Sequence, residues 1–430
     1  MAGKNLVPHN LRIVEPVVDV ANSRAEYRFQ PDRCYLADAR LINLGVNEAG
    51  GGTSYNSIVG AESVIKSLRL MDGATELDAI NDFPQWRAVQ KLGVSDDGAI
   101  SVGRYLSQNA LGYIAAGDPD TVDNTYGNSP NIQTAQSSAG AGTKAWLSLK
   151  SVFPFLRACT ILPTSIFRQL RVEIEYQSSA EMANFVIDAT QVALTTSRAL
   201  LLVDEVADPA FAAAALKAFA AAPPAWRGVV NDSWLLDATA ATADTDADRV
   251  QSQEQTQRLR AFDSQYLHNL VVKVTPLATP TSGANVNKPM GSLGSQAQYA
   301  PSWQLAVNGQ NIMPREGVQG HNRALAATTD CLGSINVAQI QTFSGFLFNE
   351  NGASTDVANT AGQAALWAQT VEQPIENLQI TIRRSGVYNN AQTYEQKRVQ
   401  CFGEVAKQLA LAPGAAAGAP SSYRIVNVQA

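Results

Sequence analysis

Charged residues are scarce in this sequence. Asp, Glu, Lys and Arg make up 16% of its 430 residues, against about a quarter in typical soluble domains. A surface with so little charge favours a subunit covered by neighbouring subunits over a chain that stays alone in solution. A neutral secreted β-protein is the alternative. The net charge of −6, without a cluster of Lys and Arg, also argues against direct, sequence-specific nucleic-acid binding, because counterion release requires such clusters.

Cysteine and histidine are few and widely spaced. The four cysteines contain no CxxC pair of the kind that binds zinc or exchanges disulfides. They are Cys34, Cys159, Cys331 and Cys401. The apolar patterns around Cys159 and Cys401 favour buried free thiols and a reducing compartment, with disulfides as the open alternative. The three histidines, His9, His268 and His321, are far apart, and the strand-like run around His268 favours a structural role.

The motifs of common enzymes and metal sites are also missing. No GxSxG elbow occurs. The run Gly45–Thr53 has glycine where a phosphate-binding loop requires Lys followed by Ser or Thr. Asp244–Asp248 resembles the start of a calcium loop, but Arg249 and Gln255 stand where Gly and Glu are required. We therefore predict no catalytic residue, no cofactor-binding residue and no metal ligand, and a chain that is not an enzyme.

Membrane and export signals are absent as well. No apolar run of 18 residues marks a membrane span. The first twenty residues lack the basic region and apolar core of a secretory signal, so we expect none.

The most informative stretch that is present is Leu147–Tyr176. Pro154 and Pro163 exclude one continuous helix through it. From Leu170 to Tyr176 every second residue is apolar and the residues between are charged, which is the period of a half-buried strand. An irregular apolar segment that leads into a strand with one solvated face is typical of an antiparallel sandwich.

The rest of the chain is predicted to be mainly β, with loops and three helical segments. We expect an extended arm over residues 1–24, and long polar loops over 121–143, 278–299 and 349–365. Predicted strands lie within 27–44, 63–70, 74–80, 197–206, 267–274, 303–313, 377–384, 398–405 and 423–428. Helices are predicted for 84–92, 322–330 and the Ala-rich segment from Asp208, an N-cap, to the Pro223-Pro224 stop.

Several signals recur in the same order in both halves of the chain. The predicted hairpin turns at 72–73 and 308–309 are 236 positions apart, and the helix ends at 92–93 and 332–333 are 240 apart. The alternating strands at 169–174 and 377–382 are 208 apart, a difference that matches the loop over 121–143. We interpret the pattern as two similar β-domains.

The run FPFLRACTILPTSIFRQLRVEIEY, within the stretch described above, resembles a segment of double jelly-roll major capsid proteins. Those proteins occur in virophages, polinton-like viruses and nucleocytoplasmic large DNA viruses. The hairpin SIVGAESVIKSLRLMDGATELDA and the strand RALLLVDEV extend the resemblance. It implies an all-β fold of two tandem eight-stranded jelly rolls joined by a short Ala-rich helix. The implied division is an arm (1–24), a first jelly roll (25–206), a connector helix (207–224) and a second jelly roll (225–430).

The resemblance implies a function and partners. Family members form homotrimers that imitate a hexagon and tile an icosahedral shell of the virion. Neighbouring capsomers, penton proteins and minor capsid proteins would be the partners, and an internal membrane beneath the shell stays open. The alternative is a receptor- or carbohydrate-binding spike or lectin-like module. A third alternative, an outer-membrane barrel, is disfavoured by the midpoint helix and by the end of the sequence, which is not aromatic.

Overall fold

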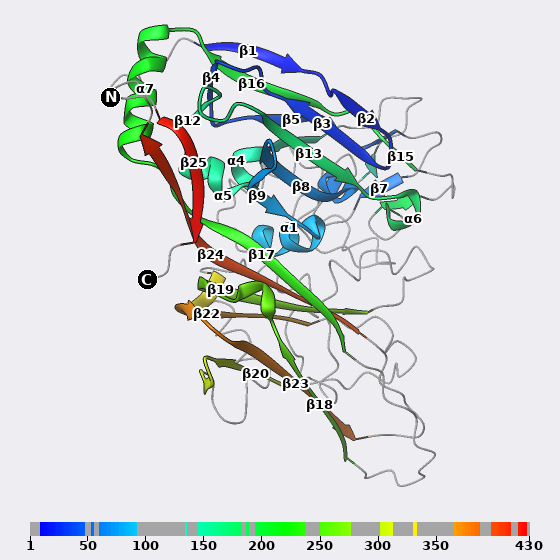
Figure 1. The fold of residues 1–430 in the computed structure, drawn as a ribbon. Coiled ribbons are helices and arrows are strands. Elements are labelled where there is room, and N and C mark those ends of the chain that lie inside the picture. The colour runs from blue at the N-terminus through cyan, green and yellow to red at the C-terminus, as the bar shows by residue number, and fades with distance from the viewer. Residues whose placement is uncertain are drawn as a thin grey trace, which may run out of the picture.

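Strands dominate the structure and lie in two groups (Figure 1). In the sequence a helix separates the two groups, and in space it lies beside the first one. The computed structural model describes residues 9–47, 53–55, 60–92, 134–135, 145–182, 186–188, 194–236, 250–276, 302–312, 330–332, 365–387, 397–413 and 420–427. All statements below concern these residues.

The first half of the chain contains the strands β1 to β16. They are β1 (His9–Val14), β2 (Val18–Val20), β3 (Arg24–Arg28), β4 (Cys34–Leu36), β5 (Arg40–Leu44), β6 (Val46–Asn47), β7 (Thr53–Tyr55), β8 (Ile65–Asp72), β9 (Thr75–Ile80), β10 (Thr134–Ala135), β11 (Ala145–Ser148), β12 (Ile161–Pro163), β13 (Leu170–Tyr176), β14 (Val186–Asp188), β15 (Thr195–Thr196) and β16 (Leu200–Val206). The helical segments are η1 (Gly60–Val64), α1 (Phe83–Leu92), α4 (Leu149–Val152), α5 (Pro154–Ala158) and α6 (Ser179–Met182).

Two larger antiparallel sheets enclose the core of the first half. Sheet 1A has the order β11-β5-β16-β4-β12, with β1 paired to the other edge of β16. Sheet 1B has the order β2-β3-β13-β8-β9. Two smaller sheets, β10-β7-β14 and β15-β6, complete this half. Buried side chains from both large sheets, such as Tyr27 and Leu201, belong to one apolar cluster, as expected for a sandwich.

The second half follows the helix α7 (Pro209–Ala221). Its strands are β17 (Ala225–Leu236), β18 (Val250–Arg258), β19 (Gln265–Pro276), β20 (Ser302–Val307), β21 (Gln310–Asn311), β22 (Ala365–Ile375), β23 (Leu378–Val387), β24 (Lys397–Pro413) and β25 (Pro420–Asn427), with the short helix η2 (Arg260–Phe262). Sheet 2A has the order β17-β24-β19-β22, with β25 paired to β24. Sheet 2B has the order β18-β23-β20-β21. The two sheets again face each other across a core.

The two halves repeat the same topology. The order β3-β13-β8-β9 in sheet 1B corresponds to β18-β23-β20-β21 in sheet 2B. The order β1-β16-β5-β11 in sheet 1A corresponds to β17-β24-β19-β22 in sheet 2A. In both halves a tight hairpin supplies the strand that pairs with the alternating strand. The predicted internal repeat is therefore present at the level of strand pairing, beyond the local signals from which it was inferred.

The hairpin turns and the alternating strands lie where the sequence predicts them. Gly73, with φ 58°, joins β8 to β9, and Asn308-Gly309, with φ 51° and 80°, joins β20 to β21. Positive φ at both central residues is the geometry that an Asn-Gly turn favours. In β13 the residues from Leu170 to Tyr176 alternate between buried and more exposed, as predicted.

The N-terminal arm predicted for residues 1–24 is wrong for much of its length. Residues 9–14 form β1 on the edge of sheet 1A, and residues 18–20 form β2 on the edge of sheet 1B. Polar and apolar residues alternate in Val18–Val20 and over Asn10–Ile13, but burial does not alternate, because both are edge strands whose apolar side chains stay largely exposed. The internal repeat could have predicted β1. The second half begins with β17, so the equivalent first strand of the first half is expected before residue 24.

The apolar stretch before β13 is broken as its prolines require. Phe153 separates α4 from α5, and Pro154 takes the first position of α5, where its missing N–H costs nothing. Phe155 and Leu156 of α5 are buried, so this short helix closes one end of the first core.

The connector helix α7 also agrees with the sequence. The Asp208 side chain accepts a hydrogen bond from the backbone N–H of Ala210, and Pro209 follows at the first helical position. Phe219 is the buried residue of this helix.

Several predicted elements lie wholly or partly outside the described residues. These are the polar loops over 121–143 (except 134–135, which form β10), 278–299 and 349–365, and the helix over 322–330 apart from its last residue. The helix over 84–92 is confirmed as α1. The strands predicted in the second half are confirmed as β19, β20, β23, β24 and β25, of which β24 is longer than predicted.

Candidate functional site

The two halves are in contact with each other, and aromatic rings take part in this contact. Phe155 of α5 meets Trp226 of β17 with ring centroids 5.0 Å apart, and Trp86 of α1 meets Phe402 of β24 at 5.5 Å. Such edge-on and tilted pairs add stability beyond the apolar area that they bury. Buried side chains of both halves thus belong to one continuous apolar cluster.

The end of β24 and the strand β25 reach onto the first half (Figure 1). The Tyr423 ring packs edge-on against Phe167 at 5.1 Å, and its hydroxyl donates to Asp72 Oδ2 at 2.7 Å. Because Asp72 ends β8, this contact fastens the last strand of the chain to the hairpin of the first half. Side-chain contacts thus join the two halves, in addition to the α7 segment that connects them in the chain.

Polar pairs surround the aromatic contacts. Arg398 of β24 donates to both carboxylate oxygens of Asp82, at 3.1 and 3.3 Å. The Asn81 amide donates to Asn231 of β17 at 3.3 Å. Both bonds to Asp82 come from the single Arg398 Nη2 atom. Together with the Asn81–Asn231 bond they provide polar contacts between the halves.

An acidic side chain is buried beside this contact. Asp78 of β9 is completely buried, and its Oδ2 accepts a hydrogen bond from the backbone N–H of Phe155 at 2.9 Å. Loss of hydration raises the pKa of Asp78 to about 7, while the Phe155 N–H and the charge of Lys407 act in the opposite direction. Asp78 therefore changes its charge near neutral pH.

A basic side chain is buried in the second half. Lys273 of β19 is 1% exposed, and burial lowers its pKa to about 7. Lys273 is paired with Gln400, and Val271 two residues earlier is paired with Phe402. Directly opposed residues share a face of a sheet, so Lys273 lies on the same face as Phe402, the face of sheet 2A that packs on the first half.

A third feature is a group of exposed apolar side chains on the first half. Leu11 and Ile13 of β1 are 60% and 59% exposed, and Trp146 of β11 is 44% exposed. Leu11 and Ile13 are opposed to Asp204 and Leu202 of β16. They therefore lie on the outer face of sheet 1A, because Leu201 and Val203 fill its inner face. Exposed apolar side chains that gather on one face indicate a contact with another molecule.

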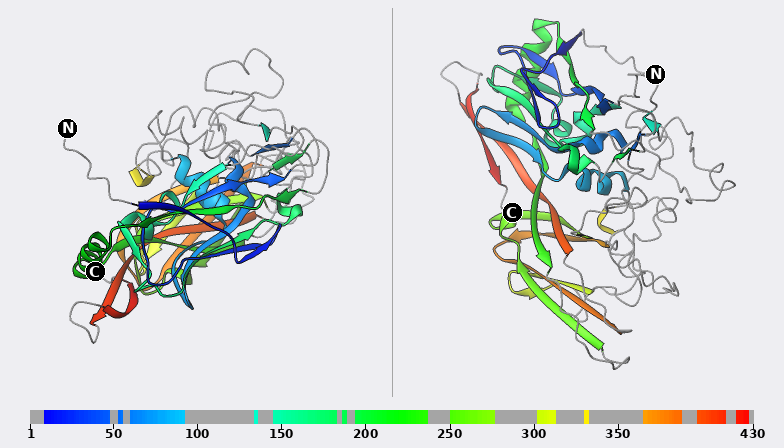
Figure 2. Two further views of the ribbon diagram at one scale, coloured as in Figure 1. Left: turned by 90° about the horizontal axis from the view of Figure 1, so that it is seen from above. Right: turned by 90° about the vertical axis from the view of Figure 1, so that its right-hand side faces the viewer.

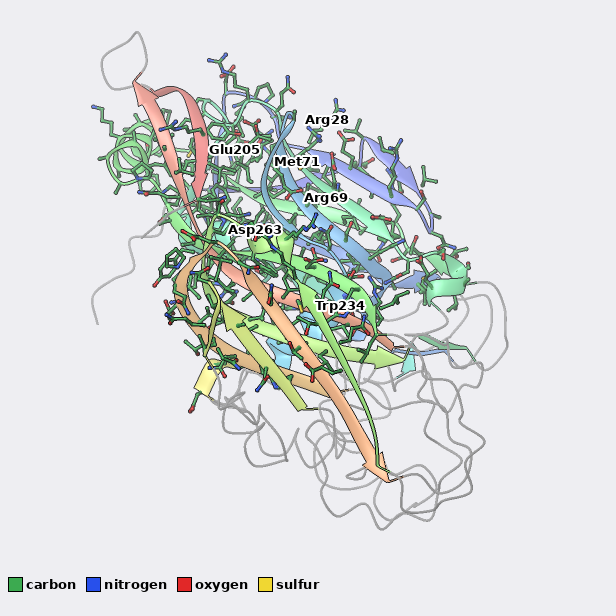
Figure 3. The ribbon with its side chains drawn as sticks, turned by 60° about the horizontal axis from the view of Figure 1, so that its bottom comes forward. Arg28, Arg69, Met71, Glu205, Trp234 and Asp263 are labelled. Carbon is green, nitrogen blue, oxygen red and sulfur yellow. The ribbon has the colours of Figure 1, made fainter. Side chains whose placement is uncertain are left out.

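The outer face of sheet 1B is charged instead. Alternation in β3, β8 and β13 places ionic side chains on it, and Figure 3 shows Arg28 and Arg69 on this sheet. Two pockets open on the face. The Arg69 Nε atom is buried without a hydrogen-bond partner within the described part of the chain.

The described histidines do not form a catalytic group. His9 lies 3.6 Å from Asp204 across β1 and β16. His268 Nδ1 lies 2.9 Å from Glu372, whose carboxylate also accepts a hydrogen bond from the Tyr266 hydroxyl. These described contacts hold no nucleophile with a base, and the structural role of His268 stays a prediction. His321, residues 48–52 of the glycine-rich run and Asp244–Asp248 lie outside the described residues.

Metal and membrane features were sought in the same ranges. Over the described segments, no three His, Cys, Asp or Glu side chains are grouped to hold a metal ion. Nor does any helix there have the length and apolar character to cross a membrane. Cys159 and Cys401 are buried free thiols, as predicted, and Cys34 and Cys331 are free and partly buried.

Comparisons with known proteins agree with the strand order. No family model matches the sequence, and no curated protein matches it. The structure is similar to the major capsid protein of Faustovirus, with a TM-score of 0.51, 7% identity and coverage of 93% of this chain and 90% of that one. It is also similar to the mavirus major capsid protein, with a TM-score of 0.50, 10% identity and coverage of 95% and 89%. The chain has the double jelly-roll fold of these major capsid proteins, as the sequence resemblance implied.

Proposed function

We propose that the chain is a structural capsid protein, whose trimers imitate a hexagon and tile an icosahedral shell of a virion. The double jelly-roll fold supports this proposal over a receptor- or carbohydrate-binding module. The observation that carries it is a difference between two equivalent faces of the molecule. One is covered within the chain, and the other exposes the apolar side chains Leu11, Ile13 and Trp146 beside ionic groups such as His9 and Asp204.

The covered face belongs to sheet 2A. Phe402 and Arg398, which are on the same side of β24, contact Trp86 and Asp82 of the first half. The opposite side of β24 faces the core of the second half, since a Cβ added at Gly403 would lie 2.3 Å from the Phe262 ring. The outer face of sheet 2A thus contributes Phe402 and Arg398 to the contact with the first half. Trp226, which is opposite Lys407 and so on the other side of the β17–β24 pair, adds its contact with Phe155.

The equivalent face of sheet 1A has no such cover within the described part of the chain. Its strand β1 corresponds to β17, and β16 corresponds to β24. It displays Leu11, Ile13 and Trp146. Since the same face of the second half packs on a jelly roll, we infer that this one packs on the second half of a neighbouring copy.

Repetition of one such contact closes a ring. The two halves meet through different surfaces, in a head-to-tail manner, and contacts of this kind form closed rings when the rotation allows it. Three chains with two halves each would give six similar units around one axis. The exposed face of sheet 1A would then be buried at every chain-to-chain junction, which also accounts for the low charge of the sequence.

The proposal includes the division of the chain and its partners. The first jelly roll would run to residue 206 with β1 and β2 included, residues 207–224 would connect, and residues 225–430 would form the second. Neighbouring capsomers, penton proteins and minor capsid proteins would be the partners. No catalytic activity is proposed, since the role requires side-to-side burial and not a reactive group.

The test is the mass and shape of the purified chain. We expect light scattering to give three times the mass of one chain, and negative-stain microscopy to show pseudo-hexagonal particles. A single-chain mass that persists at high protein concentration would refute the proposal. Specific retention of such a monomer on a glycan array would favour the carbohydrate-binding alternative.

A further inference from the structure

Two ion pairs lie side by side on the outer face of sheet 1B. Arg28 Nε is 2.5 Å from Glu26 Oε1 within β3, and Arg171 Nε is 2.6 Å from Glu173 Oε1 within β13. Each pair joins residues two positions apart on the same side of its strand. The two strands are neighbours in the sheet.

The strand register aligns these pairs in parallel. Arg28 is directly opposite Arg171, and Glu26 is directly opposite Glu173. Like charges opposed across a sheet are unfavourable, and a favourable arrangement would place each arginine opposite a glutamate. The positive ends of both pairs therefore meet at one place. An arrangement of like charges that is locally unfavourable in this way is typical of functional sites.

A pocket opens where the positive ends meet, and a third arginine lines it. The pocket has a volume of about 350 Å³. It is lined by Arg28, Phe29, Pro31, Arg168, Gln169, Leu170 and Arg171. Arg168 is exposed, and no carboxylate of the described residues forms a salt bridge with it. Three guanidinium groups thus share one pocket with no carboxylate in its lining.

Uncommitted donors remain on these arginines within the described structure. Arg28 bonds Glu26 through Nε, which leaves its two terminal nitrogens. Arg171 uses Nε for Glu173 and Nη1 for the Gly73 carbonyl, which leaves Nη2. The planar guanidinium group is suited to paired hydrogen bonds with oxyanions, which it makes better than an ammonium group does.

We propose that this pocket binds a small ligand through a doubly charged phosphate or sulfate group. Two of the three arginines already contact one glutamate carboxylate each. A phosphate or sulfate group offers more charge and more acceptor oxygens than such a carboxylate. The volume lies at the lower end of the range for small-molecule sites. The inference concerns a single chain and does not depend on the assembly proposed above.

A neighbouring pocket on the same sheet provides an internal comparison. Its volume is about 260 Å³. It is lined by Arg24, Ala25, Glu26, Ser67, Arg69, Glu173, Ile174 and Glu175. Three carboxylates in its lining oppose a bound anion, so this pocket should not take one. Arg24 therefore offers a matched control: it lies on β3 and faces the same side of the sheet as Arg28.

The test is calorimetric titration of the full chain with inorganic phosphate, and separately with sulfate, at constant ionic strength against chloride. We compare the wild type, Arg168→Gln, the double variant Arg28→Gln/Arg168→Gln, and the control Arg24→Gln. Thermal unfolding and circular dichroism check that each variant is folded. Arg168→Gln should fold normally, because its side chain is exposed.

The expected result is saturable binding to the wild type and to Arg24→Gln. Affinity should fall severalfold in Arg168→Gln and at least tenfold in the double variant. Binding that does not saturate, or that is equal in all four proteins, would overturn the proposal. Equal losses in Arg24→Gln and Arg168→Gln would also overturn it, since general surface charge would then be responsible.

Discussion

The first strands of the two halves hold the same place in the fold but meet different surroundings. β1 is 6 residues long and ends the outer edge of sheet 1A with Leu11 and Ile13 exposed. Its counterpart β17 is 12 residues long and runs from the first half toward the second (Figure 2). Its Trp226 ring packs on Phe155. The same strand position therefore forms a contact between the halves in the second half and leaves apolar side chains exposed in the first half. The difference is the basis for the proposed junction between copies of the chain.

The halves also differ in the charge that they bury. The first half buries an acid, Asp78, and the second a base, Lys273, both with pKa values moved to about 7 by loss of hydration. Each lowers the stability of the fold in its charged form. The stability contributions of these two buried groups should therefore depend on pH in opposite ways.

The largest expected effect is on assembly, and it comes from removing the apolar character of the exposed β1 side chains. Replacing Leu11 and Ile13 together by Glu places charge on the outer face of sheet 1A, where the proposed junction excludes water. We expect the mass measured by light scattering to drop from three chains to one. The matched control is Leu235→Glu, which changes a side chain that is 42% exposed on the second half. A trimer that survives the double change would show that the junction lies elsewhere.

A smaller effect is expected inside the second half. Gly403→Ala would place a methyl group 2.3 Å from Phe262 and 2.7 Å from Leu267, so the core must shift. Overpacking of this kind costs about 1–3 kcal/mol. Gly228→Ala is the control, because its methyl group would meet only the flexible Lys407 side chain, at 2.7 Å. Urea denaturation should show a clear loss for Gly403→Ala, and a loss of similar size in both variants would contradict this account.

The buried charges predict opposite pH dependences. Asp78 keeps its proton up to a pH of about 7 in the folded chain, but only to about 4 when unfolded. Its contribution to stability is thus complete below about pH 4 and is lost as the pH rises through 7. Asp78→Asn should therefore stabilise the protein at pH 8 and have little effect at pH 4.

Lys273 gives the reverse case. It loses its proton above a pH of about 7 when folded, but only above about 10.4 when unfolded. Its contribution is complete above about pH 10 and is lost as the pH falls through 7. Lys273→Met should stabilise at pH 6 and much less at pH 10. The free energy of unfolding, measured by urea titration at one protein concentration, checks both variants. Parallel pH profiles for the two would contradict the assignment of opposite buried charges.

The smallest expected effect concerns the polar rim between the halves. Arg398→Gln removes the ion pair between Arg398 and Asp82. The Arg398 side chain is 42% exposed. Solvent-exposed pairs contribute about 0.2–1 kcal/mol, so we expect a loss in this range that diminishes as salt is added. Arg424→Gln, an exposed change on β25 with no such pair among the described residues, is the control. A loss that does not depend on salt would indicate a packing effect in place of an ionic one.

Much of the fold follows from local patterns in the sequence. The alternation over Leu170–Tyr176 predicts β13 because side chains of a strand alternate between its two faces. Asn308-Gly309 predicts its hairpin because only such residues adopt positive φ at low cost. The N-cap Asp208 and Pro209 predict the start of α7 for similar local reasons. These features depend on a few neighbouring residues, so no tertiary contact is needed to recognise them.

The surfaces and sites could not be predicted in the same way. Polar and apolar residues alternate from Asn10 to Ile13, which fits a strand, but nothing in these residues indicates that the strand lies at an edge with Leu11 and Ile13 exposed. Arg28 and Arg171 are far apart in the sequence, and only the register of β3 against β13 places them opposite each other. The prediction that no catalytic residue exists stays a prediction.

The sequence by itself determined the strand periods, the turns, the connector helix and the duplication, because each depends on short-range geometry. Tertiary structure alone decided which of two equivalent sheet faces is covered, where Asp78 and Lys273 lose their water, and where three arginines meet. Those outcomes depend on segments far apart in the sequence that come into contact only when the chain has folded. Burial and charge are properties of that contact and not of any segment alone.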